Sequence, residues 1–109
     1  MKFDGYQIQA RKTAIYPDKG KNFIYPTLGL VGETGEIAEK IKKVIRDKKG
    51  IFDNETKLAL KKEIGDVLWY LSNLCDEFNF SLSDVAKTNL EKLKLRASKG
   101  NISGSGDDR

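Results

Sequence analysis

The chain has 109 residues, of which 39% are hydrophobic and 33% charged, and its formal net charge is +4. This balance fits one globular domain and excludes a disordered polypeptide, and no apolar run approaches the roughly 18 residues that a membrane-spanning helix needs. The net charge alone would suit a polynucleotide, but the lysines alternate with acidic residues, so we expect no polynucleotide partner.

We predict four helices and no strands, which makes the fold class all-α. The first helix runs from about Asp4, a candidate N-cap, to Ile15. A loop with the sequence "YPDKGKNFIYP" follows, and its two prolines and glycine end any helix there. The second helix begins near Thr27 and ends before Gly50, a residue typical of helix C-termini.

The third helix is expected to begin at Asp53 or Asn54 and to end near Phe78. The fourth opens with "SLSD", in which Ser81 begins a sequence typical of a capping box, and it ends near Gly100. The last residues form a Gly/Ser-rich tail without a packing pattern. We therefore expect an all-α domain over residues 1–98 and a C-terminal tail over residues 99–109.

Helical periodicity places apolar side chains on one stripe of each long helix. The stripes comprise Leu28, Val31, Ala38, Ile41, Val44 and Ile45 in the second helix, Leu60, Ile64, Val67, Leu68, Leu71, Leu74, Cys75 and Phe78 in the third, and Leu82, Val85, Ala86, Leu90 and Leu93 in the fourth. Such stripes predict a helical bundle of about four helices, which we expect oligomerisation to complete. Trp69 lies opposite its stripe and is expected at a protomer interface.

Two residue types limit the chemistry. The chain contains no histidine, so the usual acid/base group at neutral pH and the usual zinc ligand are missing. A metal site would have to use carboxylates, which favours Mg²⁺, with Mn²⁺ as a possible substitute. The single cysteine, Cys75, cannot form an internal disulfide, and the N-terminus has no apolar signal segment, so we expect a cytoplasmic location.

Acidic residues spaced three apart occur in both long helices, but such pairs arise easily by chance in a chain with 16 acidic residues. Glu36 and Glu39 have an ordinary explanation, because Lys40 and Lys43 follow them at the spacing of ion pairs on a solvated helix face. Spacing alone therefore favours a solvated face for these two glutamates.

Glu33, Glu63 and Asp66 resist that explanation, because no cation follows any of them four positions later. They flank apolar stripes on two helices and would meet across a groove if these helices pack together. Uncompensated carboxylates raise one another's pKa, and a divalent cation resolves that conflict. Gly32 and Gly35 then mark places where a neighbouring helix or a ligand approaches the backbone closely.

Asn89, Lys92 and Arg96 share one side of the fourth helix, where the two cations could hold phosphate oxygens. The alternative is that Asn89 caps a neighbouring element and that both cations are ordinary surface residues. Tyr70 is either an aromatic residue at the edge of the core or a contact to a nucleotide.

The segments "LVGETGEIAEKIKK" and "KEIGDVLWYLSNL" together resemble the MazG-like, all-α nucleoside triphosphate pyrophosphohydrolases. In that family an E-x-x-E motif lies on one helix and an E-x-x-D motif on the next, and the matching residues are Glu33 and Glu36, then Glu63 and Asp66. The segment "TNLEKLKLR" looks like the family's following polar helix, with Asn89, Lys92 and Arg96 at the matching places. The resemblance covers about residues 25–100.

The resemblance implies hydrolysis of a nucleoside triphosphate between its α and β phosphates, giving the monophosphate and pyrophosphate. It implies that the four acids hold Mg²⁺, that Glu33 or Glu36 activates the attacking water, and that the active form is a homodimer or homotetramer. Long family members contain two such domains, whereas this chain has one. The alternative is a non-catalytic helical protein-interaction module, and the preferred base and sugar stay open.

Overall fold

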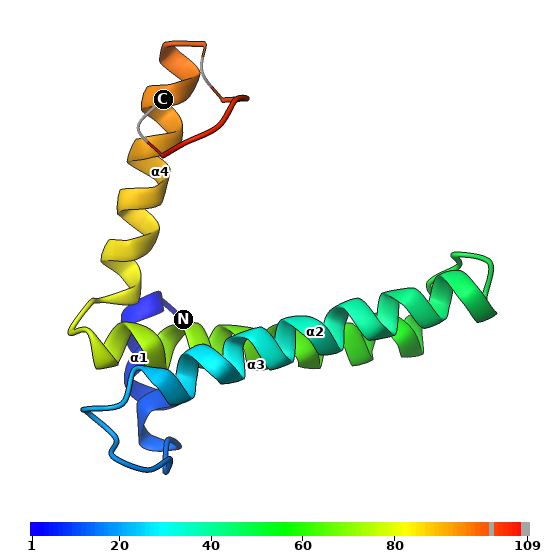
Figure 1. Ribbon diagram of the computed structural model, residues 1–109, viewed down its shortest axis with the longest axis horizontal. Helices are drawn as coiled ribbons and strands as arrows, with labels where there is room; N and C mark the ends of the chain where they lie inside the picture. Colours follow the sequence, from blue (N-terminus) through cyan, green and yellow to red (C-terminus); the bar gives the residue numbers. More distant parts are fainter. Residues whose placement is uncertain (101, 108–109) are drawn as a thin grey trace.

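The computed structural model describes residues 1–100 and 102–107, and within them it contains four helices and no strand, which confirms the all-α prediction. The helices are α1 (Phe3–Lys12), α2 (Ile24–Asp47), α3 (Asn54–Glu77) and α4 (Leu82–Ser98). Helices α2 and α3 lie side by side as a long antiparallel hairpin (Figure 1). Helix α1 packs against α3 at one end of this hairpin, and α4 packs on α1 and projects away from it (Figure 1).

The first helix differs from its prediction at both ends. Asp4 is not the N-cap but lies in the first turn, where a negative charge is favourable beside the helix N-terminus. The helix ends at Lys12 rather than near Ile15. Thr13 closes this end, because its hydroxyl donates a hydrogen bond to the carbonyl oxygen of Ala10 at 2.7 Å. A polar side chain thus satisfies a carbonyl that has no partner further along the helix.

Helix α2 begins one turn before the predicted Thr27. Its first turn contains Pro26, which does not interrupt the helix because the N–H groups of a first turn have no helical acceptor. The side-chain oxygen of Asn22 accepts a hydrogen bond from the backbone N–H of Tyr25 at 3.0 Å. The segment expected to be entirely loop therefore contributes its last residues to the helix.

The starts of α3 and α4 agree with the sequence prediction. The carboxylate of Asp53 accepts from the backbone N–H of Thr56 at 2.8 Å, and the hydroxyl of Ser81 accepts from that of Asp84 at 3.0 Å. Both are N-cap hydrogen bonds that satisfy otherwise unpaired donors. Helix α4 ends at Ser98, and Gly100 follows with a φ of 70°, which a glycine adopts without strain.

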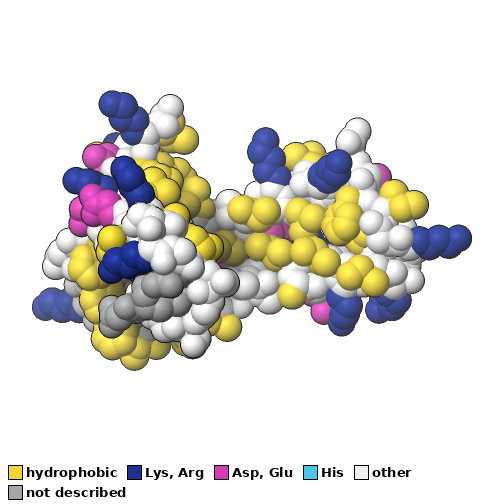
Figure 2. Space-filling model, turned by 90° about the horizontal axis from the view of Figure 1, so that it is seen from above, with side chains coloured by type: hydrophobic (Ala, Val, Ile, Leu, Met, Phe, Trp, Pro, Cys, Tyr) yellow, Lys and Arg dark blue, Asp and Glu magenta, His cyan; other side chains and the backbone are white. Residues whose placement is uncertain are grey.

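The predicted apolar stripes are only partly covered within one chain. Val44 is buried, but Leu28, Val31 and Ile45 are 66%, 68% and 64% exposed, because no helix of the described chain covers this face of the hairpin. Hydrophobic side chains accordingly extend along the hairpin arm between lysine and arginine side chains (Figure 2). No helix in the described part of the chain is long and apolar enough to cross a membrane.

The buried residues concentrate where α1 meets α3 and the start of α4. They include Ala10, Ala14, Tyr16, Cys75 and Leu82. Trp69 also faces this junction, because its indole N–H donates to the hydroxyl of Thr13 at 2.7 Å. The polar end of Trp69 thus finds its partner within the chain, and the expectation that Trp69 lies at a protomer interface stays a prediction.

Candidate metal centre

Three carboxylates from two helices gather on the hairpin. Glu33 of α2 and Glu63 and Asp66 of α3 each offer an oxygen, and these oxygens lie within 4.8 Å of one another. The spacing of three residues places Glu63 and Asp66 on one face of α3, and the antiparallel packing brings that face beside Glu33. Glu33 and Glu63 are half-buried, whereas Asp66 is exposed.

The electrostatics of this acidic cluster show the expected conflict between like charges. Burial, a hydrogen bond to Glu63 and the negative charges of Asp66, Glu63 and Glu36 raise the pKa of Glu33 above its ordinary value. One cation relieves part of this repulsion, since Nζ of Lys40 lies 3.7 Å from Oε1 of Glu63. The acidic cluster retains an excess of negative charge.

A divalent cation fits this set of donors. Carboxylate oxygens are preferred by Mg²⁺ and Mn²⁺, and opposite ligands of Mg²⁺ stand about 4.2 Å apart at its usual bond length. Oxygens within 4.8 Å of one another can close on one ion by small side-chain rotations. The exposure of Asp66 leaves one side of the acidic cluster open to water and substrate.

Glu36 lies one turn further along α2 and does not belong to the acidic cluster. Its side chain is exposed and has no ion pair within the described residues. The expected pair with Lys40 is not formed, because that lysine reaches across to Glu63. Glu39 behaves as the solvated-face interpretation predicts, with Lys42 at 2.9 Å and Lys43 at 3.9 Å.

Tyr70 follows Asp66 by one turn of α3 and packs against the backbone of α2 at Gly29. A Cβ atom added to Gly29 would overlap the ring of Tyr70. Burial, with contributions from Tyr25 and Glu33, raises the pKa of the Tyr70 hydroxyl. Tyr70 therefore lies between the acidic cluster and the ring of Tyr25, whose centroid is 6.5 Å away.

Within the chain, the close backbone approach that was predicted at Gly32 and Gly35 occurs at Gly29, and an approach of a ligand or a second chain to the first two glycines stays a prediction. An added Cβ at either of the first two glycines meets no atom of the described chain within 4 Å. Sequence reasoning missed Gly29, although it stands four residues before Glu33 and therefore shares its helix face. It also missed Tyr6 of α1, which lies near enough for the charge of Asp66 to contribute to its raised pKa, after burial.

The predicted residues of α4 are not brought to the acidic cluster within one chain. Asn89 is exposed on α4, the helix that projects away from the hairpin (Figure 1). Lys92 and Arg96 instead contact Asp107 of the C-terminal tail, at 3.1 Å and 3.3 Å. Asn89 does not cap a neighbouring element among the caps described for the helices.

Glu77, which sequence periodicity places on the same flank as Glu63 and Asp66, has a structural role. Its side chain is 1% exposed and accepts hydrogen bonds from Arg11, Tyr16 and the backbone N–H groups of Gly20 and Asn22. Burial alone would raise its pKa, but these donors outweigh burial and lower the pKa to about 2. Glu77 thus connects the α1–α2 loop to the end of α3 through these hydrogen bonds.

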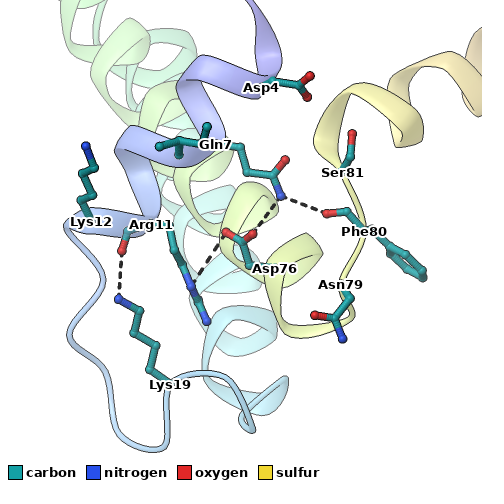
Figure 3. Close-up of a pocket in the computed structure, with 10 residues that line it drawn as sticks. Asp4, Gln7, Arg11, Lys12, Lys19, Asp76, Asn79, Phe80 and Ser81 are labelled. Carbon is teal, nitrogen blue, oxygen red and sulfur yellow. Dashed lines mark hydrogen bonds and ion pairs between the residues drawn. The ribbon is translucent and has the colours of Figure 1, made fainter.

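A pocket of about 800 Å³ lies between α1 and the α3–α4 connection, and none of the clustered acids lines it (Figure 3). Gln7 crosses it and donates to Asp76 at 3.0 Å and to the carbonyl of Phe80 at 2.9 Å (Figure 3). Its side-chain oxygen accepts from the backbone N–H of Leu82 at 2.7 Å. These bonds fix the start of α4 against α1, and so they set the direction of the projecting helix.

Comparison with known proteins agrees with these motifs. The sequence profile of the MazG nucleotide pyrophosphohydrolase domain matches residues 26–100, a range that includes every predicted site residue. The Gene 37 protein of Mycobacterium phage L5 is 47% identical over 114 aligned positions, which cover all of both chains. No solved structure matches the chain significantly.

Proposed function

The chain belongs to the MazG nucleotide pyrophosphohydrolase family, and from that premise we propose that it hydrolyses a nucleoside triphosphate between its α and β phosphates with the help of Mg²⁺. The observation that carries the proposal is the gathering of Glu33, Glu63 and Asp66 around one position. Housecleaning of nucleotide pools is the matching cellular role. A cytoplasmic location stays a prediction.

In this proposal Glu33, Glu63 and Asp66 hold the metal. Bound there, Mg²⁺ supplies charge neutralisation for the triphosphate and acidifies an attacking water. Glu36 is the group that we assign to accept the proton of that water, because it is exposed one turn from the cluster and free of ion pairs in the described chain. The water oxygen bonds to the α phosphorus, the α–β bridging bond breaks, and pyrophosphate leaves.

The other half of the proposed site comes from a second copy of the chain. Helix α4, which carries Asn89, Lys92 and Arg96, projects away from the hairpin (Figure 1). The hairpin face with Leu28 and Val31 is exposed. A homodimer or homotetramer that covers this apolar face could bring α4 of one protomer to the hairpin of another. The phosphates would then lie between carboxylate-held Mg²⁺ and the two cations.

The test is to incubate the protein with a panel of NTPs and dNTPs plus Mg²⁺ and to follow the release of pyrophosphate. Glu63→Gln and Asp66→Asn should each lower kcat/KM by more than about 100-fold, since even outer-shell partners of metal ligands contribute 10- to 100-fold. Glu39→Gln is the matched control, because Glu39 pairs with solvent-exposed lysines outside the cluster. Mg²⁺ should raise the Tm of the control but not that of Asp66→Asn.

No turnover on any nucleotide would contradict the catalytic proposal. In that case the exposed apolar face favours the alternative function, a helical module that binds another protein. Turnover that survives both Glu63→Gln and Asp66→Asn would instead show that the metal ligands are assigned wrongly.

A further inference from the structure

The C-terminal tail returns to the helix that precedes it. Residues 102–107 run back beside the end of α4 (Figure 1). The carboxylate oxygen Oδ1 of Asp107 lies 3.1 Å from Nζ of Lys92 and 3.3 Å from Nη2 of Arg96. The two α4 cations that match the family motif are therefore already in contact with an anion of the same chain.

The contacts of Arg96 with the tail use donors that a phosphate group would also use. Besides the carboxylate, Nη2 of Arg96 donates to the carbonyl oxygens of Asp107 at 2.5 Å and of Gly106 at 3.5 Å. A terminal guanidinium nitrogen carries only two N–H groups, and these tail oxygens occupy them. The tail therefore takes up donors that would otherwise bind the oxygens of a phosphate.

Arg96 also has a hydrogen-bond donor that the tail does not use. The Arg96 side chain is only 7% exposed, yet its buried Nε has no hydrogen-bond partner within the described residues. A cavity of about 390 Å³ adjoins it, lined by Thr88, Lys92 and Lys99 among others. A buried N–H donor without an acceptor favours a ligand with more oxygens than one aspartate side chain provides.

We propose that the C-terminal tail is an intramolecular competitor for the phosphate-binding cations of α4, with Asp107 in the place of a substrate or product phosphate. The inference rests on the proposed function for the identity of the phosphate, but not for the contact itself. The tail must leave Lys92 and Arg96 before a pyrophosphate group binds them.

The competition is expected to be weak and reversible. The Asp107 side chain is 82% exposed and that of Lys92 39% exposed, and ion pairs this exposed contribute little to stability. Because Asp107 is tethered 11 residues from Arg96 and 15 from Lys92, its effective concentration lies in the millimolar range. The tail therefore raises the ligand concentration needed for binding without closing the site.

The experiment uses the full-length protein in EDTA and inorganic pyrophosphate as the probe, so that the acidic cluster cannot contribute through a metal. Calorimetry should give Asp107→Asn a pyrophosphate affinity roughly three- to tenfold higher than that of the unmodified chain, the range expected for loss of two ion pairs that share an 82% exposed carboxylate. Asp47→Asn removes the same charge at the far end of α2 and should leave the affinity unchanged. In an Arg96→Gln background the effect of Asp107→Asn should be smaller, because only the ion pair between Asp107 and Lys92 remains to be removed.

Nuclear magnetic resonance of the unmodified chain gives a readout that does not depend on activity. Saturating pyrophosphate should move the amide resonances of Gly104 and Gly106 to their positions in Asp107→Asn. Unchanged tail resonances, equal affinities of Asp107→Asn and the unmodified chain, or an effect of undiminished size in the Arg96→Gln background would each overturn the proposal. Tighter pyrophosphate binding by Asp107→Asn without turnover of any nucleotide would support the tail proposal while contradicting the proposed function.

Discussion

Gly29 and Gly32 lie three residues apart on α2 and are expected to respond oppositely to substitution. Gly29→Ala forces a methyl group into the ring of Tyr70, and such overpacking costs roughly 1–3 kcal/mol. Gly32→Ala meets no described atom within 4 Å and should stabilise the helix by up to about 1 kcal/mol. Urea unfolding at one fixed protein concentration measures both changes.

Equal effects of the two alanines would contradict the packing of Tyr70 on Gly29. A loss of stability in Gly32→Ala that grows with protein concentration would instead indicate that a second copy approaches α2 there. This comparison separates packing within the chain from packing between chains, because only the latter depends on concentration.

At the scale of single residues, the sequence predicted which carboxylates lie together better than it predicted their ion pairs. Glu33, Glu63 and Asp66 were singled out because no cation follows them on their own helices, and the structure gathers them. The pair between Lys40 and Glu63 crosses from α2 to α3, so no spacing within one helix reveals it. Glu77 has the same periodicity as Glu63, and only the fold of the α1–α2 loop separates their roles.

At the scale of elements, Glu77 should control how firmly the α1–α2 loop is held. Its pKa is lowered from an ordinary 4.5 to about 2, which corresponds to roughly 3 kcal/mol of stability at neutral pH. We expect Glu77→Gln to lower the free energy of unfolding by about that amount at pH 7. Urea titrations at constant protein concentration give the difference directly.

The lowered pKa of Glu77 determines how its contribution to stability changes with pH. Because the folded state lowers the pKa of Glu77, its stabilisation is fully present above the unfolded value near 4.5 and is lost as the pH falls toward 2. The difference between the unmodified chain and Glu77→Gln should therefore shrink between pH 5 and pH 2. Glu39→Gln, an exposed control, should show no comparable loss at pH 7, and a pH-independent difference for Glu77→Gln would contradict the assignment.

The existence and approximate limits of the helices were predictable because caps and breakers are local. Asp53 and Ser81 begin α3 and α4 as their side chains suggest. The start of α2 was misplaced because Pro26 was taken as a breaker, although a first turn tolerates proline. The direction of α4 depends on Gln7, whose bonds reach residues 69 and 73 positions away, and no local pattern reports such contacts.

At the scale of the whole molecule, the exposed hairpin face predicts association. Ile45 is 64% exposed, lies on this face and is at least 12 residues away in sequence from every member of the acidic cluster. Sedimentation should show a dimer or tetramer for the unmodified chain. Ile45→Lys should weaken association on the order of 100-fold or more, because it places a charge in every copy where the proposed interface would bury an apolar side chain. Ile15→Lys, at a 93% exposed loop position, is the control.

A monomeric unmodified chain would contradict the proposed assembly and with it the supply of Asn89, Lys92 and Arg96 from a second copy. Retained association in Ile45→Lys together with loss of association in Ile15→Lys would place the interface elsewhere on the molecule. Either result would leave the acidic cluster itself intact, because that cluster is formed within one chain.

The hairpin arm also has a consequence for how the molecule forms. Helices α2 and α3 are consecutive, and only residues 48–53 separate them, so their pairing requires the closure of one short loop. Such topologies fold on the microsecond to millisecond scale, whereas the meeting of two chains slows as the solution is diluted. If the chain associates as proposed, newly made protomers should therefore form their helices quickly, and the apolar face of α2 should stay exposed until two chains meet, at a rate that depends on their concentration.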